Sequence, residues 1–285
     1  MISTVVISRD RPSQLHLLLE SLQLNGGNLF DTTVLFEASS EYFAEGYLQT
    51  QYHFSKKHRH DFNFPIRWQS RKNSDLNQDI LGTIFNSREL VCLFNDQNIL
   101  FDRVPAYKKI KKLFSHYSLS ALSLRLGNNT IIQNPYEVGN YFVDKPKDGE
   151  FDFDKFLIWD ATKIKSYTNF GVPFSTNGHI YHKNVIKNVL ARTKVENHED
   201  FELLTQKNLY SGSFGGKVPP EMACVEYSVV VSNSCDKISD SESSKYDTTE
   251  LGVNHRYIDG MRIDYSSFDF SHISKPYEDF TVFFK

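Results

Sequence analysis

The pattern at the start of this chain constrains its fold more than any other feature. Residues 2–7 alternate and then become β-branched, which predicts a strand. Residues 15–22 carry leucines at spacings of three and four, which predicts an amphipathic helix with Ser13 as its N-cap. Residues 32–36 predict a second strand. A strand, a helix and a strand in this order form a βαβ unit, so we expect a parallel sheet.

Polar side chains follow the predicted strands. A short apolar run at residues 90–94 predicts a buried strand, and it ends in the polar run 95–98. Because open α/β sheets bind ligands beyond the carboxyl ends of their strands, we expect these polar residues to form a site. An acid after the second strand suits a ribose hydroxyl or a uracil N–H, and an arginine suits a diphosphate. The candidate binding residues are Ser8, Arg9, Asp10, Arg11, Glu37, Arg67, Asn95 and Asp96.

Composition excludes some classes of function. The chain has 285 residues and a net charge of −3, so no basic field favours nucleic acid as a partner. No apolar run approaches the roughly 18 residues of a transmembrane helix, and residues 1–7 lack the features of a signal peptide. The three cysteines, an odd number, point to a reducing compartment, and we predict a cytoplasmic protein.

The second half of the chain predicts further elements around the same edge. Residues 103–114 predict a basic amphipathic helix, whose lysines either face solvent or make a peripheral contact with a membrane. Residues 176–180 lie in a loop that enters a strand. The acidic run 196–202 opens a helix, where carboxylates suit the helix dipole. Residues 224–231 predict a strand, and the polar residues 232–250 predict a flexible loop suited to act as a lid.

The order of these motifs resembles that of nucleotide-sugar-dependent glycosyltransferases of the GT-A fold, in particular family-2-like enzymes. Residues 5–15 are similar to the first strand, the Arg-Pro loop and the first helix of that family. Glu37 matches its nucleoside-binding acid, residues 94–99 stand where its Asp-rich metal motif is expected, and residues 176–180 resemble its acceptor-side loop. The pair at 199–200 resembles the Glu-Asp pair that carries the catalytic base of inverting members.

The resemblance implies an α/β, GT-A (Rossmann-like) fold. Such a fold has a mixed, mostly parallel central sheet flanked by helices, here in a single domain with a C-terminal extension. The implied glycosyltransferase domain is 1–231, with a nucleotide-binding half at 1–102 and an acceptor half at 103–231. The flexible loop 232–250 follows, and a helix and tail at 251–285 pack on the same domain.

The resemblance also implies an activity. A sugar would pass, with inversion, from a nucleoside-diphosphate-sugar of UDP or GDP type to a hydroxyl of a glycan or glycoconjugate acceptor. The implied base is Asp200, with Glu199 as the alternate, and general-base catalysis of this kind contributes about 10²–10⁴-fold in rate. The implied cofactor is Mn²⁺ or Mg²⁺, acting as a Lewis acid on the diphosphate. Its implied ligands are Asp96, Asn98 and His272. The binding residues of the acceptor-side loop are Asn177, Gly178 and His179.

Two residues depart from the family pattern. Asn95 replaces the first acid of the metal motif, and fewer charged ligands lower the expected affinity for a cation. Asn177 replaces the acid of the acceptor-side loop, which changes an expected contact to the acceptor.

Two other classes of function stay open. A reduced acidic motif also suits a catalytically degenerate module that binds a nucleotide or a carbohydrate. A nucleotidyltransferase shares the early βαβ region, but it would carry a Gly-rich loop after the first strand. Residues 8–11 contain no glycine, which counts against that class.

Overall fold

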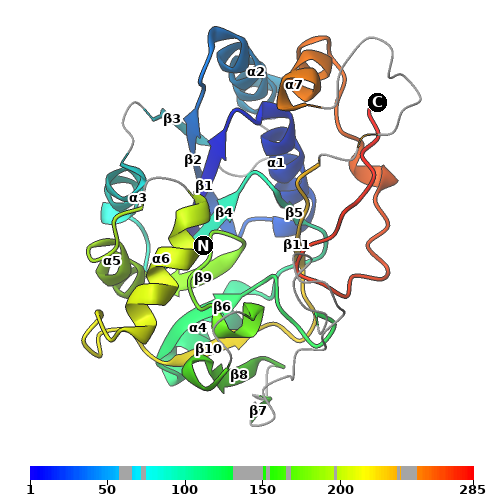
Figure 1. Ribbon diagram of the computed structural model, residues 1–285. Coiled ribbons are helices and arrows are strands. Elements are labelled where there is room, and N and C mark those ends of the chain that lie inside the picture. Colours follow the sequence, from blue (N-terminus) through cyan, green and yellow to red (C-terminus); the bar gives the residue numbers. More distant parts are fainter. Residues whose placement is uncertain are drawn as a thin grey trace.

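The computed structural model describes residues 1–57, 66–71, 75–130, 150–151, 155–164, 168–195, 198–235, 238 and 249–285. Within these residues, nine strands form one sheet with helices on both faces (Figure 1). From edge to edge the strands are β3 (Arg67–Ser70), β2 (Phe30–Glu37), β1 (Ile2–Arg9), β4 (Leu90–Asn95), β9 (His179–His182), β6 (Leu119–Ser123), β10 (Glu221–Cys224), β8 (Leu157–Asp160) and β7 (Glu150–Phe151).

Most of these strands share one direction. β1 is parallel to β2 and β4, β2 is parallel to β3, and β6 is parallel to β10. β9 is antiparallel to both its neighbours, and so is β8. In the described sheet only β8 and β9 therefore run against the other seven strands. The predicted mixed, mostly parallel sheet is confirmed, and so is the parallel βαβ unit at the start of the chain.

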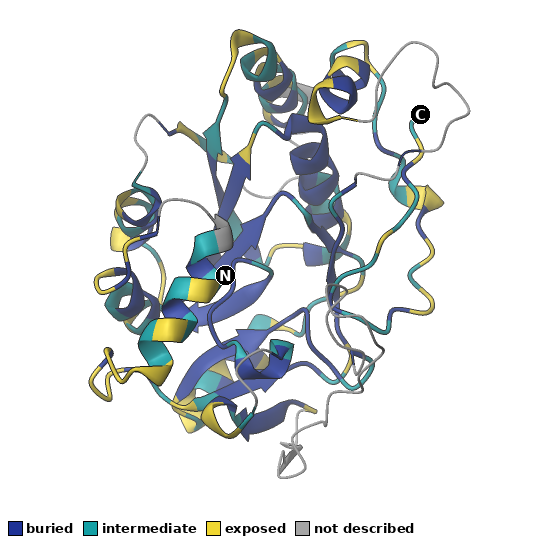
Figure 2. Ribbon diagram, in the orientation of Figure 1, coloured by how far each residue is buried: buried dark blue, intermediate teal, exposed yellow. Residues whose placement is uncertain are grey.

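Helices cover the two faces of the sheet, and each face has its own apolar core. The helices are α1 (Pro12–Gly26), α2 (Glu41–Tyr52), α3 (Leu76–Phe85), α4 (Tyr107–His116), α5 (Lys183–Leu190), α6 (His198–Tyr210) and α7 (Glu250–Ile258). Alternation along β1 sends Val6 into one core, with Leu15 of α1, and Val5 into the other, with Ile80 of α3. Figure 2 shows the central strands as almost wholly buried between these layers.

The start of α1 differs from the prediction. The helix begins at Pro12, with Arg11 at the N-cap, and not after Ser13. Proline favours the first helical position because its fixed φ suits the helix and its missing N–H would have no helical partner there. The helix therefore starts directly at the sheet edge, one residue after the turn that follows β1.

The predicted strand at 224–231 is wrong. β10 ends at Cys224, and a separate strand, β11 (Val230–Ser232), pairs with β5 (Asn98–Leu100) in a second, two-stranded sheet. The chain leaves the first sheet because its backbone bonds elsewhere: the Val229 N–H donates to the Leu124 carbonyl at 2.9 Å. This second sheet holds residues 98–100 beside Ser232, close to the edge that β4 reaches.

The C-terminal segment packs against the rest of the chain. α7 contacts α1 and α2, and Ile263 and Val282 share a core with Leu17 and Ile99. The predicted loop at 232–250 lies mostly outside the described residues. No disulfide joins any of the three cysteines. Among the helices that the structure describes, none has the length and apolar character needed to cross a bilayer.

Candidate functional site

Five strand ends meet at one edge of the sheet. β1, β2, β4 and β6 end there, and β9, which runs in the opposite sense, begins there. The loop before β9 touches β4 directly, because the Gly178 N–H donates to the Leu93 carbonyl at 2.9 Å. The parallel arrangement thus brings polar residues that follow separate strands into one site, as expected for an open α/β sheet.

The turn after β1 is fixed by Asp10. This residue has φ of 55°, a left-handed conformation that aspartate tolerates better than most residues. Its N–H donates to the Glu37 carbonyl at 3.1 Å, and its Oδ1 accepts from the Ser39 N–H at 2.7 Å. Arg9 Nε then lies 3.5 Å from Glu37 Oε1. The Arg9 side chain is 59% exposed, so its guanidinium remains accessible to an incoming anion.

The Ser8 side chain contacts α2. Its hydroxyl lies 2.7 Å from the Tyr47 hydroxyl of α2, which also accepts a hydrogen bond from the Arg11 N–H at 3.2 Å. Burial, and then the nearby charge of Asp96, raises the pKa of Tyr47 well above its usual value. Tyr47 is therefore a neutral phenol that holds the turn after β1 in place. Ser8 contributes to the site indirectly, through its contact with Tyr47.

Asp96 is buried at the end of β4. Its side chain is 3% exposed, its Oδ2 accepts from the Arg9 N–H at 3.2 Å, and its Oδ1 lies 3.9 Å from Arg11 Nη1. Arg11 also reaches the C-terminal half of the chain. Its Nε lies 3.4 Å from Glu250 Oε1, and its Nη2 donates to the Ser234 carbonyl. The predicted acid of the metal motif thus has a buried guanidinium beside it.

Glu37 is held by an arginine that the sequence pattern did not single out. Arg71 follows β3, and its Nη1 donates to Glu37 Oε2 at 3.1 Å while its Nε donates to Asp79 Oδ2 at 2.9 Å. The Arg71 side chain is only 4% exposed. A buried guanidinium between two carboxylates fixes the Glu37 side chain at the end of β2.

Arg67, a predicted binding residue, does not lie at this edge. The parallel register pairs it with Thr33, near the beginning of β2, whereas Glu37 is the last residue of that strand. Its guanidinium bonds Asp31 at 2.8 Å and Thr33 at 3.0 Å. The prediction placed Arg67 near the wrong end of β3, since only residues after the strand, such as Arg71, can reach Glu37.

Three asparagines form a closed amide network next to Asp96. Asn177 Oδ1 accepts from Asn95 Nδ2 at 3.0 Å and from Asn98 Nδ2 at 2.9 Å. Asn98 Oδ1 accepts from the Asn95 N–H at 3.0 Å, and Asn95 Oδ1 accepts from the Gln97 N–H at 3.1 Å. Asn98 Nδ2 also donates to Ser232 Oγ at 3.0 Å, a side-chain bond between β5 and β11. All three amide oxygens therefore have donors.

Gly178 allows this network to form. It has φ of +73°, and a Cβ there would lie 3.1 Å from Val230 Cγ1 and 3.2 Å from Phe94 Cε1. A residue with a side chain would be both strained and crowded. The glycine therefore lets the loop carry Asn177 against β4.

The carboxylate that α6 brings to this network is Glu202. Its Oε1 accepts from Asn177 Nδ2 at 2.8 Å and from the Ser175 hydroxyl, and it lies 3.9 Å from Arg125 Nη2. The predicted base Asp200 is half-buried two residues earlier on α6, and the Glu199 side chain lies outside the described residues. Phe201 and Thr205 face the core, and Glu202 borders that face of the helix.

His179 lies beneath the network and is neutral. It is fully buried, its Nδ1 lies 3.4 Å from the Asn177 carbonyl oxygen, and burial followed by the positive charge of Arg125 lowers its pKa to about 3. Burial also lowers the pKa of Arg125, and Glu202 opposes that shift. The His179–Arg125–Glu202 group therefore combines a neutral imidazole with one charge of each sign.

The residues predicted as metal ligands do not form a cation site together. Asn98 and Asn95 use their amide oxygens within the network, and His272 is exposed in the tail, where its charge acts on Asp269. Within the described ranges, no group of three or more His, Cys, Asp or Glu side chains is placed to hold a metal ion. The one carboxylate, Asp96, has Arg11 at 3.9 Å. This donor set does not fit Mn²⁺ or Mg²⁺, which prefer several oxygen ligands.

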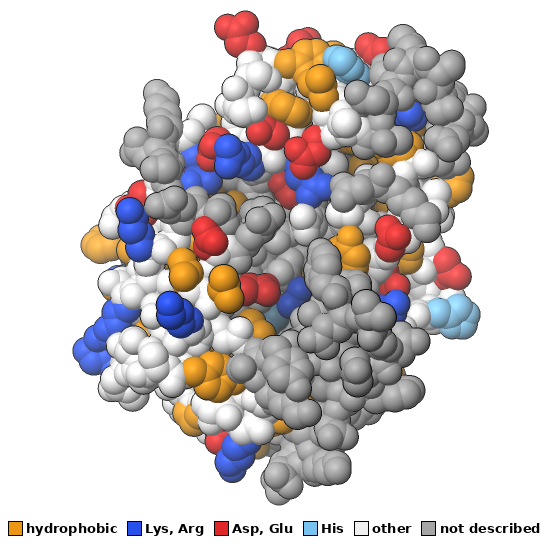
Figure 3. Space-filling model, in the orientation of Figure 1, with side chains coloured by type: hydrophobic (Ala, Val, Ile, Leu, Met, Phe, Trp, Pro, Cys, Tyr) orange, Lys and Arg blue, Asp and Glu red, His pale blue; other side chains and the backbone are white. Residues whose placement is uncertain are grey.

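Sequence reasoning missed Glu202, Arg71 and Arg125. Glu202 belongs to the acidic run that was recognised, but its position depends on how the packing of Phe201 in the core rotates α6. Arg71 lies just after β3 and Arg125 just after β6, positions that the sequence pattern did not single out. Figure 3 shows acidic and basic side chains next to one another on this face of the molecule, with neither sign dominating.

Comparison with known proteins identifies the fold. A scan against protein-family models finds no match, and a search of curated proteins finds none. Among solved structures, residues 1–349 of S. aureus TarS match with a TM-score of 0.50 and 12% identity, over 83% of this chain and 61% of that one. The same protein in complex with UDP-GlcNAc matches with a TM-score of 0.48 and 11% identity, over 79% and 56%.

The chain thus spans less than two thirds of the length of these TarS chains. At such low identity the match to TarS, a glycosyltransferase of GT-A fold, shows the fold alone. The predicted GT-A fold is confirmed.

Proposed function

We propose that this protein is a glycosyltransferase that moves a sugar from a nucleoside-diphosphate-sugar to a hydroxyl of a glycan acceptor. One observation carries the proposal. At the carboxyl edge of a GT-A sheet, charged residues follow or end β1, β2 and β4, and the amide of Asn177 links the polar run after β4 to a carboxylate of α6, Glu202. The first group suits a nucleotide and the second suits an acceptor hydroxyl.

The donor would lie over the ends of β1 and β2. Glu37 is fixed by Arg71 but is still 30% exposed, so one carboxylate oxygen can accept from a ribose hydroxyl or a uracil N–H. Arg9 is the accessible cation for the diphosphate. A guanidinium binds phosphate oxygens through two parallel N–H donors, which orients the leaving group as well as neutralising it. UDP and GDP sugars are both compatible with these contacts.

Glu202 is the proposed base. The acceptor oxygen attacks the anomeric carbon, its bond to that carbon forms, and the carbon–oxygen bond to the diphosphate breaks with inversion. Glu202 takes the proton of the attacking hydroxyl, and the electron pair of the broken bond leaves on the nucleoside diphosphate. A positioned carboxylate supplies about 10²–10⁴-fold in rate by this route. Asn177 and Ser175 orient the base through Oε1, and Asp200 is the alternative from the sequence pattern.

No step is assigned to a cation, because the donor set around Asp96 fits one poorly. Asp96 instead orients Arg9 through its backbone N–H and Arg11 through their ion pair. The charge on the diphosphate would then be balanced by guanidinium groups.

A second candidate, a module that binds a nucleotide or a carbohydrate without catalysis, is favoured by one observation. Asp96, Glu37 and Glu202 each have an arginine within 4 Å. A carboxylate that is held by a guanidinium suits the fixed geometry of a binding site better than proton transfer.

The experiment that tests the proposal measures binding and transfer separately. Thermal stabilisation by a panel of UDP- and GDP-sugars, beginning with UDP-GlcNAc, detects donor binding, since a specific ligand raises apparent stability. Release of the nucleoside diphosphate, with and without candidate glycans, detects transfer. Saturable stabilisation together with acceptor-dependent release supports the enzyme. Stabilisation without release under any condition assigns the chain to the binding-module class. Stabilisation by no nucleotide-sugar refutes both the enzyme and a module that binds nucleotides.

A further inference from the structure

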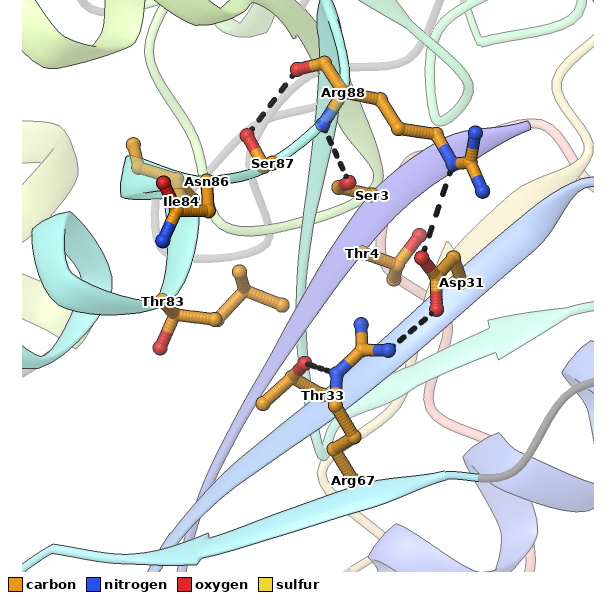
Figure 4. Close-up of a pocket in the computed structure, with 11 residues that line it drawn as sticks. Ser3, Thr4, Asp31, Thr33, Arg67, Thr83, Ile84, Asn86, Ser87 and Arg88 are labelled. Atoms are coloured by element: carbon orange, nitrogen blue, oxygen red, sulfur yellow. Dashed lines mark hydrogen bonds and ion pairs between the residues drawn. The ribbon is translucent and has the colours of Figure 1, made fainter.

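A second polar pocket lies at the other end of the strands. It has a volume of about 400 Å³ and opens between the beginnings of β1 and β2, the first residue of β3 and the C-terminal end of α3 (Figure 4). Six of its lining residues matter for its chemistry: Ser3, Asp31, Thr33, Arg67, Ser87 and Arg88. Its volume lies within the range of small-molecule sites.

The pocket exists because one face of the sheet changes character along the strands. Ile7 and Leu35 face the α3 side and pack in its core, as alternation requires. Two to four residues earlier, the positions on the same face are Ser3, Asp31 and Thr33. α3 ends at Phe85 and offers no further apolar residue to cover them. The polar side chains are therefore arranged around a cavity in place of a core.

Two guanidinium groups converge on one carboxylate in this pocket. Arg67 Nη1 lies 2.8 Å from Asp31 Oδ1, and Arg88 Nε lies 3.8 Å from Asp31 Oδ2. The Arg67 side chain is 54% exposed and that of Arg88 is 47% exposed, whereas Asp31 is 19% exposed. These three side chains carry a net charge of +1, and each guanidinium has five N–H donors. Asp31 orients both arginines without satisfying them.

Hydroxyl groups and main-chain bonds complete the pocket and hold its shape. The Arg67 Nε donates to Thr33 Oγ1 at 3.0 Å, and the Arg88 N–H donates to Ser3 Oγ at 3.0 Å. The Ser87 hydroxyl donates to the Arg88 carbonyl at 3.2 Å. The arginines are thus anchored at their inner ends, while their outer N–H groups point to space and solvent.

We propose that this pocket binds a small hydroxylated oxyanion, such as a phosphorylated or carboxylated sugar or polyol. The oxyanion would bridge Arg67 and Arg88 opposite Asp31, and the hydroxyls of the ligand would meet the Ser and Thr side chains. A planar guanidinium pairs with both phosphate and carboxylate. The two arginines therefore select a negatively charged ligand but do not distinguish these two groups.

This pocket is separate from the candidate transferase site. Ser3 lies six residues before Arg9 on β1, which corresponds to roughly 20 Å along a strand. A nucleotide at the carboxyl edge would not reach Arg67 or Arg88. The proposed ligand is therefore an additional one, and its binding does not depend on the proposed function.

Nitrogen-15 NMR of the arginine Nε–H groups tests the proposal in the full chain. Glycerol 3-phosphate and gluconate are the two anionic probes, and glycerol is the neutral control. We expect a saturable shift of the Arg67 and Arg88 resonances with one or both anions and none with glycerol. The anion with the lower dissociation constant shows whether the pocket prefers a phosphate or a carboxylate.

Matched variants localise the binding. Arg67→Gln and Arg88→Gln should each weaken the anion by about tenfold or more, the effect of losing a charged hydrogen-bond partner. Arg9→Gln, at the last residue of β1 and so at the opposite edge of the sheet, should leave the affinity unchanged. Two results would overturn the proposal: no saturable shift of either resonance with either anion, or equal weakening by Arg9→Gln and Arg67→Gln.

Discussion

The side-chain amide of Asn177 donates to Glu202 Oε1 at 2.8 Å, and this bond joins the loop before β9 to α6. The amide oxygen of the same residue accepts from Asn95 and Asn98 beside Asp96. One asparagine side chain therefore connects the carboxylate of the acceptor side with the polar run that follows β4.

Glu202→Gln should lower sugar transfer by about 10²–10⁴-fold, the usual contribution of a general base, and leave donor binding within about twofold. Glutamine keeps an oxygen that can accept from Asn177 and Ser175, so the network stays intact while proton transfer is lost. The measurement is turnover beside a nucleotide-sugar binding curve. Asp200→Asn is the matched control, two residues away on α6. If Asp200→Asn abolishes transfer and Glu202→Gln does not, the base is Asp200.

Chelation of divalent cations should leave donor affinity within about twofold, because the amide oxygens near Asp96 are already bonded and its nearest described cation is Arg11. Titration calorimetry with the donor, before and after EDTA treatment, measures this directly. Arg9→Gln should weaken the donor by about tenfold in either condition, since its exposed guanidinium is the accessible charge. A cation-dependent loss of affinity would instead place a metal at Asp96.

His179 makes stability depend on pH. Its pKa falls from 6.5 to about 3 on folding, so between these values the unfolded chain binds a proton that the folded protein does not. The contribution of the neutral imidazole is complete above pH 6.5 and is lost as the pH falls toward 3, at up to about 1.4 kcal/mol per pH unit. The free energy of unfolding, measured with urea at a series of pH values in this range, should depend less steeply on pH for His179→Asn than for the wild type. Equal slopes would contradict the burial of an uncharged His179.

Gly46→Ala and Gly82→Ala should change stability in opposite directions. A Cβ at Gly46, in α2, would clash with Asn254 Oδ1 and lie 2.5 Å from Pro12 Cγ, so we expect about 1–3 kcal/mol of destabilisation. A Cβ at Gly82, in α3, meets nothing within 4 Å, and alanine there should add about 0.5–1 kcal/mol through helix propensity. Denaturant unfolding measures both. A neutral Gly46→Ala would show that α2 and α7 are packed less closely.

Local periodicity in the sequence predicted the strands and the helix of the first βαβ unit. The strand at residues 2–7, the leucine helix and the strand at 32–36 were found because their periodicities are set by one sheet and one helix. The strand break after Cys224 was not found, because it depends on a backbone bond from Val229 to Leu124, more than a hundred residues away in sequence. Valines stand on both sides of the break, at residue 225 and at residues 229–231, so composition carried little sign of it.

The candidate site was predicted from the residues that follow strands, and no distance between their side chains entered the prediction. Glu37 and Asp96 were located because the residue after a parallel strand must lie at the edge. Arg67 was misplaced because its position depends on the register between β2 and β3, which the sequence does not state. The roles of Asp200 and Glu199 stay predictions, and Glu202 was missed because only the packing of Phe201 sets the rotation of α6.

Arg11 has partners at Asp96, Ser234 and Glu250, so the site is assembled from residues that the ribosome makes almost a whole chain apart. A nascent chain that has exposed the βαβ unit and β4 holds Arg11 and Asp96 but not the other two partners. The Arg11 guanidinium can therefore reach its contacts with Ser234 and Glu250 only after both of these residues have been synthesised.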